Sequence, residues 1–210
     1  MRTASIVLSA LSIMLPGSSC GGEGGSPLPP GQVWTERFPV YSFAGDVSMS
    51  REDWRLEIGG LAEVDTVLDY GGFVSLGAVS DTLDLHCVTG WSRRGDVWTG
   101  IPSSAILDLA RPLPGAVSVM VRCADGYTTN VPLAEFGRDG VMLAFEFDGE
   151  ALAPEHGFPV RLIVPQLYAY KSAKWVTGLE FMPEDLPGYW ESRGYHPRGD
   201  PWLEERYGTP

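Results

Sequence analysis

The chain of 210 residues has few cysteines and almost no lysine. Its three cysteines, Cys20, Cys87 and Cys123, are too few for a disulfide framework, although a Cys87–Cys123 bridge stays open. Only two of its 15 basic residues are lysines, Lys171 and Lys174, and 27 acidic residues bring the net charge to −12. We do not expect so acidic a chain to bind nucleic acid or an anionic membrane surface.

Several cofactor motifs are also absent from the sequence. It contains no Gly-x-Gly-x-x-Gly or Walker loop, no haem-attachment Cys-x-x-Cys-His and no cysteine set for an iron–sulfur cluster. The adjacent pair His86-Cys87 is a poor zinc site, because neighbouring side chains on a strand point to opposite faces. The motifs that are absent therefore disfavour nucleotide, haem, iron–sulfur and zinc chemistry.

The N-terminal residues have the composition of a targeting segment. An apolar run over residues 6–15 leads through Pro-Gly-Ser-Ser to Cys20, and a glycine-rich stretch follows. Such a run is too short to span a bilayer but suits a signal peptide. We predict a signal peptide of the lipoprotein type over residues 1–20, with Cys20 acylated, and a flexible tether over residues 21–34. A plain secretory signal and a misplaced start codon are the alternatives.

Residues 35–210 are expected to form one domain, because this length supports one substantial core but not two. A short helix is predicted over residues 105–110, with serines before it as candidate caps and Pro112 after it. The fold class is α+β, a mostly β mixed-sheet domain with short helices, and residues 183–210 are expected to wrap over it. Alternation of apolar and polar residues predicts strands near residues 54–58, 83–87, 117–121, 141–147, 160–164 and 175–181.

Cys87 is the candidate metal ligand or nucleophile. Leu83, Leu85 and Cys87 share one face of a predicted strand that ends at Thr89-Gly90. A thiol at a strand end, in a segment that also carries Arg93 and Arg94, can serve either role. A buried core cysteine is the alternative, since free cysteines are among the most buried residues.

A second candidate site contains Arg161, Lys171 and Lys174. The two lysines stand three residues apart in Lys-Ser-Ala-Lys, shortly after the arginine. In an acidic chain this clustering predicts a bound anion, with a solvated loop as the alternative. A cysteine hydrolase would instead need a histidine from elsewhere in the chain, and His156 or His196 could serve.

Three ordered blocks of the sequence together look like the molybdopterin-binding domain of the sulfite-oxidase family. They resemble most its small bacterial members, which are related to the periplasmic catalytic subunit that reduces methionine sulfoxide in proteins. The closing segment 188–207 also matches these members, so the likeness covers about residues 31–210 and implies the sulfite-oxidase molybdopterin-binding fold. The blocks are Leu85-His86-Cys87-Val88-Thr89-Gly90-Trp91-Ser92 with Trp98-Thr99-Gly100-Ile101-Pro102, Asp125-Gly126-Tyr127-Thr128-Thr129-Asn130, and His156-Gly157-Phe158-Pro159-Val160-Arg161 continuing to Lys171-Ser172-Ala173-Lys174.

The resemblance implies a molybdenum-molybdopterin cofactor and a role for each matched residue. Cys87 corresponds to the thiolate that ligates molybdenum, a soft ligand that suits this metal. Arg161, Ser172, Ala173 and Lys174 correspond to the grip on the pterin phosphate. His156, Tyr41 and Ser42 correspond to further contacts with the cofactor. Arg93 and Arg94 are candidates for a substrate pocket, with exposed turn arginines as the alternative.

The implied function is a molybdenum-molybdopterin-dependent oxidoreductase that moves an oxygen atom to or from a small substrate or a sulfoxide. Without a second redox centre, it is expected to exchange electrons with a separate electron-transfer protein, such as a membrane haem protein or a cytochrome. The expected location is the cell envelope, lipid-anchored or periplasmic, although Arg2 stands alone and no twin-arginine signal is present. The alternatives are a cytoplasmic enzyme and a cofactor-free envelope lipoprotein that uses the fold as a binding module.

Overall fold

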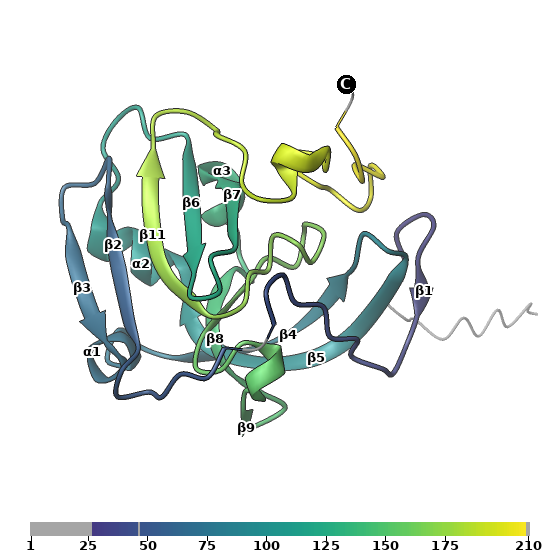
Figure 1. The fold of residues 1–210 in the computed structure, drawn as a ribbon, viewed down its shortest axis with the longest axis horizontal. Coiled ribbons are helices and arrows are strands. Elements are labelled where there is room, and N and C mark those ends of the chain that lie inside the picture. Colours follow the sequence, from purple (N-terminus) through teal and green to yellow (C-terminus); the bar gives the residue numbers. More distant parts are fainter. Residues whose placement is uncertain (1–26, 46, 209–210) are drawn as a thin grey trace, which may run out of the picture.

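The computed structural model describes residues 27–45 and 47–208. The predicted signal peptide and Cys20 lie outside the described residues. Two β-sheets form most of the domain, with short helices at their edges (Figure 1). In chain order the elements are β1 (Val33–Trp34), β2 (Arg55–Gly60), β3 (Thr66–Asp69), α1 (Tyr70–Val74), β4 (Val79–His86), β5 (Trp91–Pro102), α2 (Ser103–Ala110), β6 (Ser118–Cys123), β7 (Thr128–Pro132), α3 (Leu133–Phe136), β8 (Met142–Phe147), β9 (Glu150–Ala151), the 3₁₀-helix η1 (Pro154–His156), β10 (Arg161–Ile163), β11 (Val176–Met182) and the 3₁₀-helix η2 (Glu191–Arg193).

The first sheet is built around the long strand β5. Its order is β1-β5-β8-β10, with β4 paired to β5 and β9 paired to β8. Strands β4 and β5 form an antiparallel hairpin whose turn is closed by a hydrogen bond from Gly90 N to Cys87 O, 2.9 Å. Gly90 has a φ of 102°, a conformation that favours glycine, so the tight turn after Cys87 depends on this residue.

The second sheet has the order β3-β2-β11-β6-β7. Strand β11 is parallel to β2 and antiparallel to β6, so the sheet is mixed, as the sequence predicted. One hydrophobic core takes fully buried side chains from both sheets, among them Leu56, Val121, Ile101 and Leu143. The two sheets therefore stabilise one common domain.

The strands predicted from alternation are confirmed, but the predicted helix start is wrong. Helix α2 begins at Ser103 with Pro102 at the N-cap, and no side chain caps it. Ser103 lies inside the helix and is 2% exposed, so neither serine is needed as a cap. The helix ends where Arg111 adopts a left-handed φ of 50°.

The predicted tether over residues 21–34 is wrong at its C-terminal end. Val33–Trp34 form β1, which pairs in parallel with the start of β5. Gln32 is buried at 7% exposure, and its Nε2 donates to the carbonyl oxygen of Cys87 at 3.1 Å. The folded domain therefore starts several residues earlier than predicted, and its first segment supports the turn that carries Cys87.

Residues 183–208 wrap over the domain without adding a strand to either sheet, which confirms the expectation for this segment. In Figure 1 this tail, drawn in yellow, leaves β11 and passes the end of β7. Main-chain hydrogen bonds attach the tail to the domain at two places. In the tail, Tyr189 N donates to Thr128 O at 2.8 Å, and Gly199 O accepts from Tyr168 N at 2.7 Å. Among residues 27–45 and 47–208, no helix has both the length and the apolar composition needed to cross a membrane.

Candidate functional site

A cavity of about 380 Å³ contains the candidate site. Its walls come from the loop 38–43, the turn after β4, the η1–β10 segment, the loop 169–174 and the C-terminal tail. The fold thus brings together side chains that are more than 100 residues apart in the sequence. All eight residues that the resemblance selected line this cavity, namely Tyr41, Ser42, Cys87, His156, Arg161, Ser172, Ala173 and Lys174.

Cys87 lies at the end of β4, where the hairpin turn fixes its backbone. Its N–H donates to Trp91 O at 2.8 Å, and its sulfur is 3.2 Å from Thr89 Oγ1. Burial raises the pKa of the Cys87 thiol, while the Thr89 hydroxyl and the charge of Arg206 oppose the shift. The thiol is a free, buried sulfur, and a bound metal cation is what would favour its thiolate form.

Arg161 is a buried cation that lacks an anionic partner among the described residues. Its Nη1 donates to His156 O and its Nη2 to Ser172 O, both at 3.0 Å, whereas its Nε has no hydrogen-bond partner. Burial lowers the pKa of Arg161 to about 10. A buried guanidinium with an unused donor fits an anionic group such as a phosphate, so this part of the cavity suits the phosphate end of molybdopterin.

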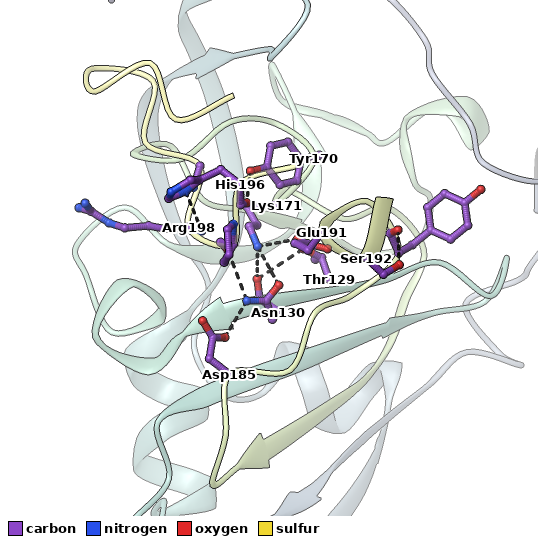
Figure 2. Close-up of polar contacts among 12 residues, drawn as sticks. Thr129, Asn130, Tyr170, Lys171, Asp185, Glu191, Ser192, His196 and Arg198 are labelled. Carbon is purple, nitrogen blue, oxygen red and sulfur yellow. Dashed lines mark hydrogen bonds and ion pairs between the residues drawn. The ribbon is translucent and has the colours of Figure 1, made fainter. Parts of the chain in front are cut away.

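The loop 171–174 separates the two lysines that the sequence placed together. Lys174 lines the cavity, and its Nζ donates to Glu155 O at 2.7 Å. Lys171 points away, with a fully buried side chain whose Nζ is 2.5 Å from Glu191 Oε1 (Figure 2). The prediction of one anion-binding lysine cluster is therefore wrong for Lys171, because a carboxylate of the same chain already neutralises it. Ser172 is buried, and its Oγ accepts from Val164 N at 3.0 Å.

His156 is the histidine that reaches the cavity. Its ring stacks on Phe38 at 4.1 Å between centroids, and burial together with Arg161 lowers its pKa. His86 points elsewhere and bonds through Nδ1 to Ser92 Oγ at 2.8 Å, while His196 Nδ1 lies 3.3 Å from Glu205 Oε2. Among the described residues no hydrogen bond joins Cys87 to a histidine, so the geometry gives the cysteine-hydrolase alternative no nucleophile–base pair.

The two turn arginines and the second cysteine do not line the cavity. Arg93 forms a bidentate pair with Asp96, with Nη2–Oδ1 at 2.6 Å, and Arg94 lies over the Trp34 ring. Cys123 is a buried free thiol in the main core. The substrate-pocket interpretation of Arg93 and Arg94 is therefore wrong.

Aromatic residues around Cys87 were not predicted as site residues. Trp91, Tyr170, Trp190 and Tyr195 line the cavity and pack with Cys87 in one apolar cluster. The sequence signal for these residues was the aromatic content of the tail. It predicted that the tail wraps over the domain, but not that the tail covers the cavity at Cys87. The lining of the cavity thus contains two cations, Arg161 and Lys174, and an aromatic cluster that packs with Cys87; we call them the cationic end and the aromatic or reacting end.

The chain matches known proteins over most of its length. Residues 44–190 match the family described as the oxidoreductase molybdopterin binding domain. The chain is 41% identical over 182 residues to the uncharacterised oxidoreductase YuiH of Bacillus subtilis, covering 86% of this chain and 91% of that protein. It is 31% identical over 175 residues to YedZ1, a putative protein-methionine-sulfoxide reductase subunit of Azospira oryzae, covering 81% of this chain and 66% of that protein.

A solved structure shows the same fold. The sulfane dehydrogenase SoxCD of Paracoccus pantotrophus superposes with a TM-score of 0.63 and 26% identity, covering 69% of this chain and 42% of that chain. The fold that the two proteins share is mostly β, with mixed sheets and few short helices. The chain belongs to the oxidoreductase molybdopterin-binding domain family and is an oxidoreductase whose cofactor is molybdenum–molybdopterin.

Proposed function

We propose that this enzyme transfers an oxygen atom to or from a small neutral substrate, with sulfoxides as the first class to test. The observation that carries the proposal is the separation of charge within the cavity. Its two strongly basic side chains, Arg161 and Lys174, both bond to backbone carbonyls of η1, away from the apolar cluster that holds Cys87. An oxyanion such as sulfite would require charge-assisted hydrogen bonds at the reacting end.

The reacting end offers aromatic surface in place of cations. Tyr170, Trp190 and Tyr195 surround the Cys87 sulfur, and sulfur groups make favourable contacts with aromatic rings. Arg206 is near enough for its charge to oppose the rise in the Cys87 pKa, but its Nη1 donates to Val88 O and it does not line the cavity. A neutral sulfoxide or thioether therefore suits this end better than an anion.

The chain's own residues have separate tasks in this proposal. Bound molybdenum–molybdopterin supplies the oxygen-atom transfer and the change of metal oxidation state. The Cys87 thiolate holds the metal, and Arg161, Lys174, Ser172 and Ala173 hold the phosphate. His156, Tyr41 and Ser42 contact the pterin between them. Tyr41 is 60% exposed, so solvent and substrate reach the cavity from the loop 38–43.

We also propose that the electrons come from, or go to, a separate redox protein, such as a membrane haem protein or a cytochrome. The Azospira relative is named a subunit of a reductase, which supports a partner chain. The proposed location is the cell envelope, with Cys20 as a lipid anchor, and the cytoplasm is the alternative. A cofactor-free binding module is the competing function, but it would leave the buried charge of Arg161 without an anion.

Metal content and substrate choice test the proposal together. Protein purified from a host that makes molybdopterin should contain close to one molybdenum per chain, and it should reduce dimethyl sulfoxide or methionine sulfoxide with a reduced dye. Sulfite should not be oxidised with ferricyanide as the acceptor. Oxidation of sulfite without any sulfoxide reduction would overturn the substrate class. Molybdenum below about a tenth of an equivalent would instead favour the binding module.

A further inference from the structure

The C-terminal tail forms one wall of the cavity at Cys87. Trp190 and Tyr195 line the cavity, with ring centroids 5.0 Å apart, and Tyr195 also meets Tyr170 at 5.3 Å. The family match ends at residue 190, so most of this wall lies beyond the part of the chain that the family model describes. The tail therefore contributes to the reacting end a surface that the family model does not describe.

A buried ion pair attaches this wall to the rest of the domain. Glu191 directly follows Trp190, and its Oε1 accepts from Lys171 Nζ at 2.5 Å and from Thr129 Oγ1 at 2.6 Å (Figure 2). Both charged side chains are fully buried. Neither lines the cavity. The pair therefore acts on the site only through the residues beside it.

Asn130 of β7 extends this attachment. Its backbone oxygen and Oδ1 accept from Lys171 Nζ at 2.7 and 3.0 Å, and its Nδ2 donates to Asp185 Oδ1 at 2.6 Å and to Pro197 O at 3.3 Å. Three points of the tail, at Asp185, Glu191 and Pro197, thus join one polar network (Figure 2). Its bonds at Glu191 are buried, whereas those to Asp185 and Pro197 are part-buried. Glu191 Oε2 is buried without a hydrogen-bond partner among the described residues, so the network is not fully satisfied. Its other buried groups are paired, and because separating a buried polar group from its partner is costly, the network favours one arrangement of the segments that it joins.

Lys171 also connects the network to the opposite wall. It directly precedes Ser172, Ala173 and Lys174, which line the cationic end of the cavity. The ion pair therefore joins the tail to the loop 171–174, and both segments line the cavity.

We propose that Trp190 and Tyr195 determine which substrates reach Cys87 by size, and that Glu191 is the positioning residue that holds them through Lys171. The selection among sulfoxide substrates rests on the proposed function. The limit on the size of a molecule that can reach the Cys87 sulfur does not depend on it. The rings face the thiol from a segment fixed at three points, so they restrict bulky groups without a moving lid.

The test compares two sulfoxides of different size on the molybdenum-loaded enzyme. Replacing Tyr195 by Ala should raise kcat/KM for methyl phenyl sulfoxide relative to dimethyl sulfoxide by about tenfold or more, as expected when a specificity pocket is enlarged. Glu191→Ala should shift the ratio in the same direction, and the conservative Glu191→Gln should restore much of the wild-type ratio. Leu203→Ala, an exposed tail substitution, is the matched control. An unchanged ratio in both Tyr195→Ala and Trp190→Ala overturns the proposal.

A second measurement separates the size limit from the proposed function. If the wild type reduces no sulfoxide, the full chain prepared without cofactor, in a Cys20→Ala/Cys123→Ser background, is treated with N-ethylmaleimide and with a fluorescein maleimide. The ratio of the two modification rates at Cys87 reports access by size at constant thiol chemistry. Tyr195→Ala should raise the relative rate of the bulky reagent several-fold, and an equal ratio in variant and wild type overturns the size limit. The maleimide experiment needs no Glu191 variant, so it tests the size limit even if Glu191→Ala does not fold.

Discussion

Removing the carboxylate of Glu191 should leave a fully buried ammonium group without its counter-ion. Burial lowers the pKa of Lys171, and Glu191 is the largest influence that opposes this shift. Breaking a buried pair by deleting one partner typically costs about 3–5 kcal/mol. For a chain of this size, each kcal/mol shifts the melting temperature by roughly 2–4 °C, so Glu191→Ala should melt about 6–20 °C below the wild type.

Thermal and urea unfolding of a double-mutant cycle measure this cost. The cycle uses Lys171→Met, Glu191→Ala and the double variant Lys171→Met/Glu191→Ala. The double variant removes both charges, so it should recover much of the loss seen in Glu191→Ala. It should stay roughly 1–3 kcal/mol below the wild type, because the two Asn130 oxygens lose their buried donor. The reasoning is refuted if Glu191→Ala unfolds within about 1 kcal/mol of the wild type, or if the two single substitutions simply add.

The pH dependence of the stability of Glu191→Ala independently tests whether the variant buries Lys171 as an uncompensated ammonium group. Without the carboxylate, the pKa of Lys171 in the folded protein should fall further below its unfolded value of about 10.4. Between these two pKa values the unfolded chain binds more protons than the folded chain, so the stability of the variant should rise with pH. The deficit relative to the wild type should therefore shrink from neutral pH toward pH ~10. A deficit that grows over this range would contradict a buried, uncompensated ammonium.

The remaining predictions concern the cofactor and the anchor. Cys87→Ser should remove activity and the thiolate-to-molybdenum absorption band while much of the pterin stays bound, whereas Cys123→Ser should change neither. Arg161→Ala or Lys174→Ala should lose roughly 2–5 kcal/mol of phosphate binding, so the purified protein should contain little molybdenum, and full occupancy in both would place the phosphate elsewhere. In cofactor-free protein the alkylation rate of Cys87 should still be rising at pH 9, because burial raises its pKa. Wild-type protein should enter the membrane fraction and Cys20→Ala should not, and uncleaved protein in the cytosol would exclude the lipid anchor.

Strands whose apolar residues face one core were predictable, and strands held by polar contacts were not. Alternation revealed β2, β6, β8 and β11 because one face of each packs into the common core. Strand β7 gave no such signal, because its buried residues Thr129 and Asn130 are polar. Their side chains are paired by hydrogen bonds with Glu191, Lys171 and Asp185. Strand β1 has only two residues and exists through its pairing with β5, which no local pattern encodes.

The resemblance selected eight residues from four segments, and all of them line one cavity, while their roles toward the cofactor stay predictions. The shape of the cavity was not predictable. Lys171 shows why sequence alone did not go further. It stands three residues from Lys174, and yet its side chain turns to a carboxylate 20 residues later in the tail. Lys171 pairs with Glu191 because the tail places this carboxylate beside it, and Lys174 is the lysine that lines the cavity. The course of the tail could not be predicted from the sequence.

Arg161 and Lys171 are both buried cations, but they differ in what neutralises them. Lys171 has a carboxylate and two amide oxygens of its own chain, whereas Arg161 has two backbone carbonyls and an unpaired Nε. The lowering of the Arg161 pKa from its usual range to about 10 corresponds to roughly 3 kcal/mol of lost preference for the charged form. An anion bound beside Arg161 would return much of that free energy, because it stabilises the charged form in the same buried position. Phosphate binding at this end of the cavity and the stability of the folded chain are therefore linked, and the network at Lys171 keeps its stability whether or not the cofactor is bound.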